Sequence, residues 1–425
     1  MPRRAGGDNG GDPGSDGGAL LSPLPDDVLS AVHARLSDVA DVVRCAATCR
    51  RWASVVAKDA AVLSPALPRL PRLTLGFLHQ EDAGVTARKW KRSSTAAQPR
   101  FVPMAAAAGR LLRWSFTALS DALLGDGGGL FEHARPVDAR NGRLVLELRR
   151  ERYTDALKLC VCNPMNGDVA LLPPLSGVDR PADYACALLT GHDLALPRPA
   201  SAFFRLLIVY NRRTFTALRT YSSDTGGWSK EVRRPAIPSN KLRSLGQSVV
   251  VRGVAYWHLG RSALAVRLDV PEPAEVRMPS RGVPDMPLGW RSLGVAPDGK
   301  LMYFAAGVCA GALGINIRVF RDGEWEYAEG FYYSFPQLKL QLADLWGKKG
   351  PPSFGEKVNL RWFCERSGVL FFTLGEGTSS PGAFALNLDT KELEQVVHGL
   401  DCDSWRNFVG YEMDGVTYLE TMINH

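Results

Sequence analysis

The chain lacks the short signals that secreted and membrane proteins carry. Its 425 residues hold no Asn-x-Ser/Thr acceptor for glycosylation and no CxxC pair. No apolar run approaches the roughly 20 residues needed to cross a bilayer. Residues 1–19 have no apolar core like that of a signal peptide, and their glycine-rich composition is typical of a disordered tail. We therefore expect an intracellular protein, in the cytoplasm or the nucleus, with no membrane partner.

Catalytic signatures are missing as well. The sequence has no GxxxxGK[ST] phosphate loop, no HExxH zinc helix and no GxSxG nucleophile elbow. The seven histidines are dispersed, with no pair at metal-ligand spacing. The run GDGGG (125–129) does not follow a strand and open a helix, as phosphate binding requires, and aspartates in turns, such as Asp168, bond the local backbone. We expect no cofactor, no bound metal and no catalytic residue.

Cysteine usage and charge exclude two further classes of site. The eight cysteines are scattered, and Cys160 and Cys162 lie two apart in a strand pattern, which makes them a poor zinc pair. We expect buried free thiols in a reducing compartment. The net charge of +7 includes one dense basic cluster, TARKWKRSS (86–94). Acidic residues are interspersed nearly everywhere else, so we interpret this cluster as a solvated loop and do not expect nucleic-acid binding.

One segment, LPDDVLSAVHARLSDVADVVRCAATCRRW (24–52), is dense, helical and apolar on one face. Pro25 suits the start of a helix, and Asp26 and Asp27 complement its positive end. Ser37 or Asp38 would cap a second helix, and a third short helix follows. The apolar stripe of the first helix consists of Val28, Leu29, Val32 and Leu36.

A module of this size needs something to pack against, because fewer than roughly 40 residues rarely bury enough surface to fold alone. Two interpretations follow from the pattern. The helices either cap the chain's own larger domain, or they present apolar anchors at helical spacing to a groove of a partner protein.

Residues 24–56 also resemble an F-box. The resemblance rests on Leu24, Pro25, Asp27, Leu29, Val32, Leu36, Val42, Val43, Cys49, Arg50, Arg51 and Trp52. The segment departs from the family in having Ser37 where proline is common. The resemblance implies docking on the Skp adaptor protein and, through it, on the cullin and RING subunits of an SCF-type ubiquitin ligase. The positions it implies for Skp binding are Leu24, Pro25, Leu29, Val32, Leu36, Val43 and Trp52.

The remainder of the chain reads as short strands and turns. A strand, a polar turn and a second strand recur five times, in CVCNPMNGDVALL, LRTYSSDTGGWSKEV, AVRLDVPEPAEVRM, IRVFRDGEWEYA and FALNLDTKELEQVV. Each step of the repeat holds about four strands, as in one propeller blade. A sandwich would also have many short strands, but the length and the hairpins at Trp228 and Trp325 favour a β-propeller of six or seven blades.

This region resembles the C-terminal region of plant F-box proteins, which implies a kelch-like, F-box-associated propeller. The motifs are RNGRLVLEL, CVCNPMNGDVALLPPL, YSSDTGGWS, VVVRGVAYW, CERSGVLFFTL and YEMDG. We accordingly predict a small all-α module followed by a large all-β domain. The predicted divisions are a tail at 1–19, the F-box module at 20–64, a partly irregular connection at 65–130 and the β-propeller at 131–425; residues 111–124 fit either a helix or a strand pair.

The combined expectation is a non-catalytic substrate receptor that docks on the Skp adaptor and presents an unknown target protein. The alternative is a propeller enzyme or ligand-binding protein in which the helical module is an internal cap. A polar, titratable cluster at the central channel would favour that alternative, and the sequence does not locate one.

Overall fold

A computed structural model describes most of the helical module and the strands of the β-domain. The described residues are 24–36, 39–63, 69, 73–81, 99–105, 134–148, 156–165, 167–176, 181, 183–193, 203–237, 245–267, 273–278, 291–309, 312–334, 358–374, 382–398, 402 and 404–415. The predicted tail, the basic cluster at 86–94, the run at 125–129 and the segment 111–124 lie outside them. In the described part, no helix is long and apolar enough to span a membrane.

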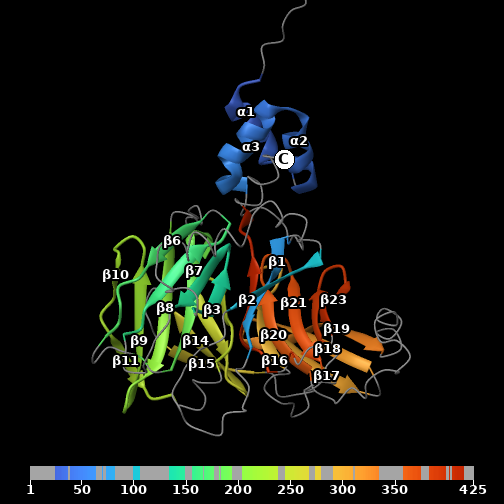
Figure 1. Ribbon diagram of the computed structural model, residues 1–425. Helices are drawn as coiled ribbons and strands as arrows, with labels where there is room; N and C mark the ends of the chain where they lie inside the picture. Colours follow the sequence, from blue (N-terminus) through green and yellow to red (C-terminus); the bar gives the residue numbers. More distant parts are fainter. Residues whose placement is uncertain are drawn as a thin grey trace, which may run out of the picture.

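The N-terminal module consists of three helices, drawn in blue at one end of the molecule in Figure 1. They are α1 (Asp26–His33), α2 (Val39–Thr48) and α3 (Arg50–Leu63). Pro25 is the N-cap of α1, and the two aspartates of the first turn are where the sequence places them. One of them, Asp26, forms an ion pair of 2.8 Å with Arg51 of α3, whose guanidinium also donates to the Leu24 carbonyl. This contact fastens the start of α1 to α3.

The β-domain is a propeller of six sheets, so the predicted fold class is confirmed with the lower blade number. Blade 1 contains β3 (Arg135–Arg140), β4 (Arg143–Glu147), β5 (Leu159–Asn163) and β6 (Asp168–Leu171). Blade 2 contains β7 (Tyr184–Thr190), β8 (Phe204–Asn211), β9 (Phe215–Ser222), β10 (Gly227–Trp228) and β11 (Val232–Pro235). Blade 3 contains β12 (Ser248–Val251), β13 (Val254–His258), β14 (Ser262–Arg267) and β15 (Pro273–Arg277).

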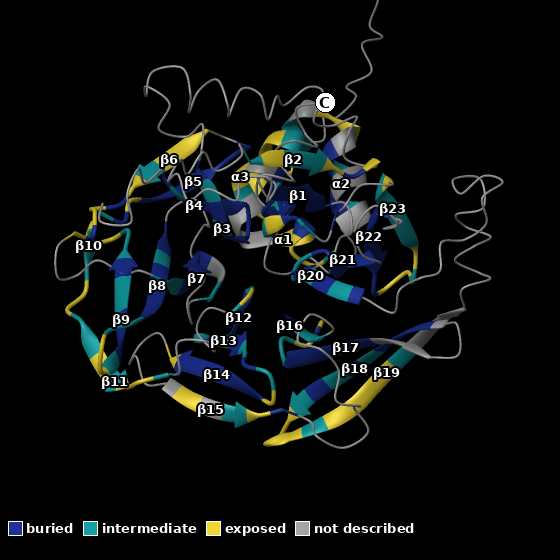
Figure 2. Ribbon diagram, turned by 60° about the horizontal axis from the view of Figure 1, so that its bottom comes forward, coloured by how far each residue is buried: buried dark blue, intermediate teal, exposed yellow. Residues whose placement is uncertain are grey.

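The other half of the ring has the same plan. Blade 4 contains β16 (Arg291–Val295), β17 (Leu301–Cys309), β18 (Ala312–Arg321) and β19 (Glu324–Ser334). Blade 5 contains β20 (Val358–Cys364), β21 (Val369–Leu374), β22 (Gly382–Asn387) and β23 (Leu393–His398). Each inner strand contacts the inner strands on both sides, in the circular order β3, β7, β12, β16, β20 and β24. Figure 2 shows buried strands within the blades in dark blue, such as β8, β14 and β17, and exposed outer strands such as β15 and β19.

Blade 6 closes the ring with strands from both ends of the chain. The inner strand β24 (Arg406–Glu412) pairs with β1 (Thr74–Gln80), which pairs with β2 (Arg100–Pro103). Residues 74–80 and 100–103 fall inside the segment that we assigned to a connection, so the propeller begins before residue 131. Its two halves lie hundreds of residues apart, and no local repeat connects them.

The five recurring hairpins are the outer strand pairs of blades 1 to 5. The two hairpin tryptophans join neighbouring blades in the same way. Trp228 donates its indole N–H to the Pro173 carbonyl at 2.8 Å, and Trp325 donates to the Arg277 carbonyl at 2.8 Å. Each indole therefore forms a hydrogen bond to the preceding blade and connects the outer parts of two neighbouring blades.

Candidate functional site

The outer face of the first helix carries exposed apolar side chains. Leu24, Val28 and Val32 have 55%, 40% and 41% of their surface exposed, respectively. They lie four residues apart, so they form one stripe along α1. Pro25 is exposed beside them. Leu24 lies just before α1, and Val28 and Val32 lie on it, so three exposed apolar side chains follow one line at the start of the module.

The opposite face of α1 packs into the module. Leu29 is 1% exposed, and the His33 ring lies edge-on to the Trp52 ring with centroids 5.4 Å apart. Neither ring nitrogen of His33 has a hydrogen-bond partner in the described structure, and burial lowers its pKa, which Asp59 opposes. Among the described side chains of the module, Val42, Ala46, Val55 and Val56 are also buried. In the described part of the module, the outer stripe is therefore separate from the buried side chains.

The residues predicted to bind Skp divide between these two faces. Leu24, Pro25 and Val32 lie on the outer face, together with Val28, which the prediction omitted. Leu29 lies in the interior and Leu36 and Trp52 are half-buried; Val43 belongs to α2, but its side chain is outside the described part. The division follows from how α1 packs on α3, which helical spacing alone does not specify.

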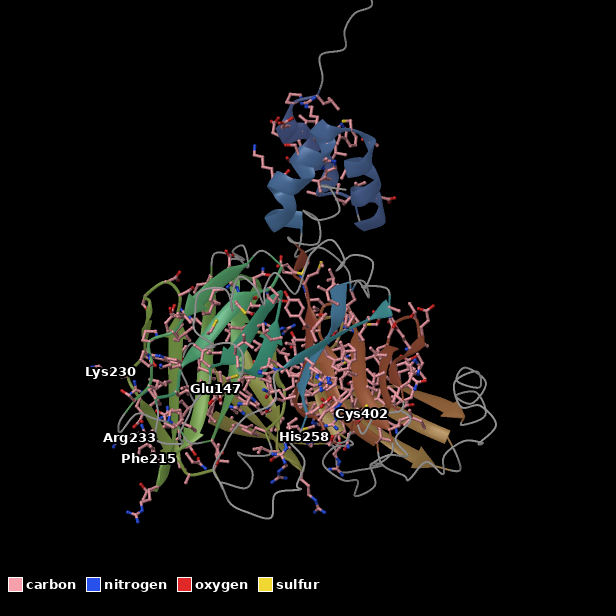
Figure 3. All side chains as sticks on the ribbon, viewed as in Figure 1. Glu147, Phe215, Lys230, Arg233, His258 and Cys402 are labelled. Atoms are coloured by element: carbon pink, nitrogen blue, oxygen red, sulfur yellow. The ribbon has the colours of Figure 1, made fainter. Side chains whose placement is uncertain are left out.

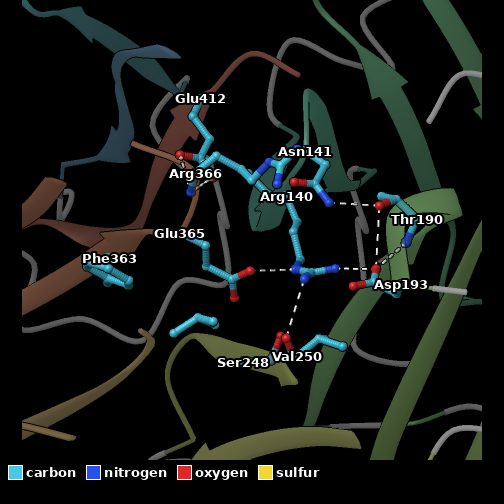
Figure 4. Close-up of polar contacts among 12 residues, drawn as sticks. Arg140, Asn141, Thr190, Asp193, Ser248, Val250, Phe363, Glu365, Arg366 and Glu412 are labelled. Atoms are coloured by element: carbon cyan, nitrogen blue, oxygen red, sulfur yellow. Dashed lines mark hydrogen bonds and ion pairs between the residues drawn. The ribbon is translucent and has the colours of Figure 1, made fainter. Parts of the chain in front are cut away.

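The propeller has its own polar cluster, centred on Arg140 at the end of β3 (Figure 4). The Arg140 guanidinium is buried and forms ion pairs with Asp193, after β7, and with Glu365, after β20, the second at 2.9 Å. Its third nitrogen donates to the Val250 carbonyl of β12 at 3.4 Å. One side chain thus connects four blades at the axis of the ring.

Further buried carboxyl groups surround this arginine. Asp138 accepts a hydrogen bond of 3.2 Å from the Ser248 hydroxyl, and burial raises its pKa to about 7. Burial also raises the pKa of Glu365, against the attraction of Arg140. The Glu412 carboxylate accepts hydrogen bonds of 3.1 Å from the backbone N–H groups of residues 366 and 367, and burial raises its pKa too. Asp138 and Glu412 thus bond to Ser248 and to backbone N–H groups, and one carboxylate oxygen of Glu365 has no hydrogen-bond partner in the described structure. The ion pairs of Arg140 connect blades, and the cluster is also the polar feature at the axis that the ligand-binding alternative predicts.

No sequence pattern indicated this cluster. Arg140 is separated from Asp193 by 53 residues and from Glu365 by 225. A usable signal would have been the charged residues at or just after the ends of three inner strands, namely Arg140, Asp193 and Glu365. In the described structure, no group of three or more His, Cys, Asp or Glu side chains could hold a metal ion.

Residues 21–62 match the family model for F-box-like domains, which covers the three helices. The N-terminal module is an F-box-like domain. Its match supports classifying the chain as an F-box protein, while the propeller lies outside the matched residues. No curated protein matches the chain.

Solved structures resemble this chain only in part. A prolyl endopeptidase has a TM-score of 0.32 and 12% identity, over 68% of this chain and 38% of its own. Kuenenia stuttgartiensis hydrazine synthase has a TM-score of 0.32 and 11% identity, over 60% and 63%. The β-propeller domain of the Trilobed protease from Pyrococcus furiosus has a TM-score of 0.33 and 10% identity, over 63% and 86%. The chain spans less than two thirds of the first two, and similarities at this level carry no argument about activity.

Proposed function

We propose that the chain is a substrate receptor of an SCF-type cullin-RING ubiquitin ligase, which docks on the Skp adaptor through the F-box-like domain. The observation that supports it best is the exposed stripe of Leu24, Val28 and Val32, which lies on the face opposite the buried Leu29. An apolar helix face of this kind is what a groove on a partner protein binds. Cullin and RING subunits would then join through Skp.

The propeller would hold a target protein close to the ubiquitin-loaded enzyme. In this mechanism the receptor supplies no reacting group, and the rate increase comes from the effective concentration of the bound target. Such a platform benefits from rigidity. Two features give the propeller rigidity, because both connect distant parts of the chain. They are the closure of the ring by β24, β1 and β2 and the ion pairs of Arg140.

The connection between the two parts is also anchored. Arg69, six residues after the end of α3, donates to the Val295 carbonyl of blade 4 and lies 3.8 Å from the Asp389 carboxylate of blade 5. Its guanidinium stacks on the Phe363 ring at 5.5 Å, and only 10% of the side chain is exposed. A buried arginine with these partners fixes where the chain enters the propeller, which would help to orient a target relative to the ligase.

Capture of the ligase subunits tests the proposal. The immobilised full chain should retain purified Skp adaptor, and it should retain a cullin–RING pair only when Skp is added. The double variant Val28→Asp/Val32→Asp should weaken Skp binding at least about thirtyfold, or about 2 kcal/mol, since it places two charges in an apolar contact. Both side chains are exposed, so the variant should remain folded.

The propeller offers a matched control. Val169 and Leu171 of β6 are 40% and 59% exposed, so Val169→Asp/Leu171→Asp makes the same chemical change away from the helices. It should leave Skp binding unchanged. Equal losses in both variants, or no capture by the folded parent, would contradict the proposal. If the folded parent captures no Skp, the helices would be an internal cap, and the polar cluster around Arg140 would become the first site to examine for ligand binding.

A further inference from the structure

Exposed arginines gather at the end of the propeller remote from the F-box-like domain. Figure 3 labels Arg233 and Phe215 at this end of blade 2. Arg213 lies in the turn just before β9, whose first residue, Phe215, pairs with the last residue of β11, so this turn adjoins that end of the strand.

Blade 3 presents two more exposed arginines at the same end of the propeller. His258, labelled at the same end in Figure 3, is the last residue of β13, and the following turn contains the exposed Arg261. Arg277 of β15 pairs with Ser262 and therefore lies beside that turn. We call Arg213, Arg233, Arg261 and Arg277 the distal arginine cluster; all four side chains are exposed.

The positive charge of the cluster is only partly compensated. In the described structure, Arg213 and Arg277 have no ion pair and no side-chain hydrogen bond. Glu231 lies beside Arg233, but its carboxylate is 13% exposed and also accepts from Arg212 at 2.9 Å and from the Tyr210 hydroxyl at 3.1 Å. The Arg233 side chain remains 71% exposed despite this contact. Because Glu231 is shared among Arg212, Arg233 and Tyr210, it compensates the exposed Arg233 guanidinium only in part.

Strand geometry favours an extended ligand at this place. Among the described strands, β11 pairs only with β9, so its other edge is open. An extended peptide can add to such an edge, and guanidinium groups bind carboxylates bidentately. The Arg233 guanidinium lies over the Phe215 ring at 4.8 Å, which restricts its orientation.

We propose that the distal arginine cluster binds an extended, carboxylate-rich segment of a partner protein. The inference rests on the proposed function for the role of that partner, which would be a target held on the far side of the propeller from the ligase. Single-stranded nucleic acid is the weaker match, because it needs aromatic faces for stacking. The nearby Phe215 is half-buried under Arg233, and the exposed Tyr327 belongs to blade 4.

The test measures binding of a fluorescein-labelled, glutamate-rich peptide to the full chain by anisotropy. A glutamine version of the peptide and a labelled single-stranded RNA serve as competing ligands. The parent should bind the glutamate peptide, less tightly as salt rises from about 50 to about 200 mM. The triple variant Arg213→Glu/Arg233→Glu/Arg277→Glu should lose at least about tenfold in affinity.

Three exposed arginines at the other end of the blades give a control with the same change in net charge. They are Arg252 in the turn before β13, Arg267 at the end of β14, which pairs with the first residue of β13, and Arg321 at the end of β18. Their reversal to glutamate should change the affinity less than about twofold. Circular dichroism and thermal midpoints would establish that both triple variants are folded.

Several outcomes overturn the inference. They are no peptide binding by the parent, tighter binding of RNA, equal binding of the glutamine peptide, and equal losses in the two triple variants. The first would leave the arginines as protection of an open sheet edge. Skp binding is measured on the same proteins and should be unaffected by the distal variant. Failure of the cluster therefore shows in the peptide assay, whereas failure of the proposed function shows in the Skp assay.

Discussion

Replacement of Asp138 by asparagine should stabilise the propeller, by an amount that depends on pH. The pKa of Asp138 rises from 3.8 to about 7 because the carboxyl group is buried. A carboxyl group with a raised pKa in the folded state contributes stability that is fully present below its unfolded pKa. That stability is lost as the pH rises through the folded pKa. Asparagine cannot ionise and retains the size and hydrogen-bonding atoms of the neutral acid.

The size of the effect follows from the two pKa values. A difference of about 3 units corresponds to roughly 4 kcal/mol, reached at about pH 7 and constant above it. The advantage of Asp138→Asn over the parent should therefore grow by about 2–3 kcal/mol between pH 5 and pH 8.

Urea unfolding at several pH values, followed by tryptophan fluorescence, measures this advantage, with Asp224→Asn in an exposed turn as the control. A constant difference between variant and parent, or a less stable variant at pH 8, would refute the reasoning. A constant difference would mean that Asp138 is ionised over the whole pH range, because Arg140 stabilises the carboxylate.

Three further changes have expected outcomes. Arg140→Met removes the cation between two buried carboxylates and should cost about 3–5 kcal/mol at pH 8, less at pH 5, in urea unfolding. Arg69→Ala should destabilise the propeller by about 1–3 kcal/mol, because the Val295 carbonyl loses this donor, and should speed proteolysis of the connection several-fold. Gly294→Ala should destabilise by about 1–3 kcal/mol in thermal unfolding, since its new Cβ would lie 2.5 Å from Phe304 and 2.7 Å from Phe363.

Local patterns predicted what depends on local structure. The five outer hairpins were visible because their strands are adjacent in sequence, and the helical module because its caps and spacing are local. Blade 6 was missed because Phe77 of β1 pairs with Gly410 of β24, at the other end of the chain. Helical spacing placed Leu29 and Val32 on one stripe, yet one is buried and the other exposed. Packing on α3 decides between them, and that contact is made in three dimensions.

Calorimetric titration of the Skp adaptor into the full chain would measure this docking in solution. We expect saturable binding at one Skp per chain, with a negative heat-capacity change because the stripe of Leu24, Val28 and Val32 becomes buried. The heat should vanish with Val28→Asp/Val32→Asp and persist with Val169→Asp/Leu171→Asp. Absence of binding by a folded parent, or equal binding by both variants, would contradict the claim that the outer face of α1 docks on Skp.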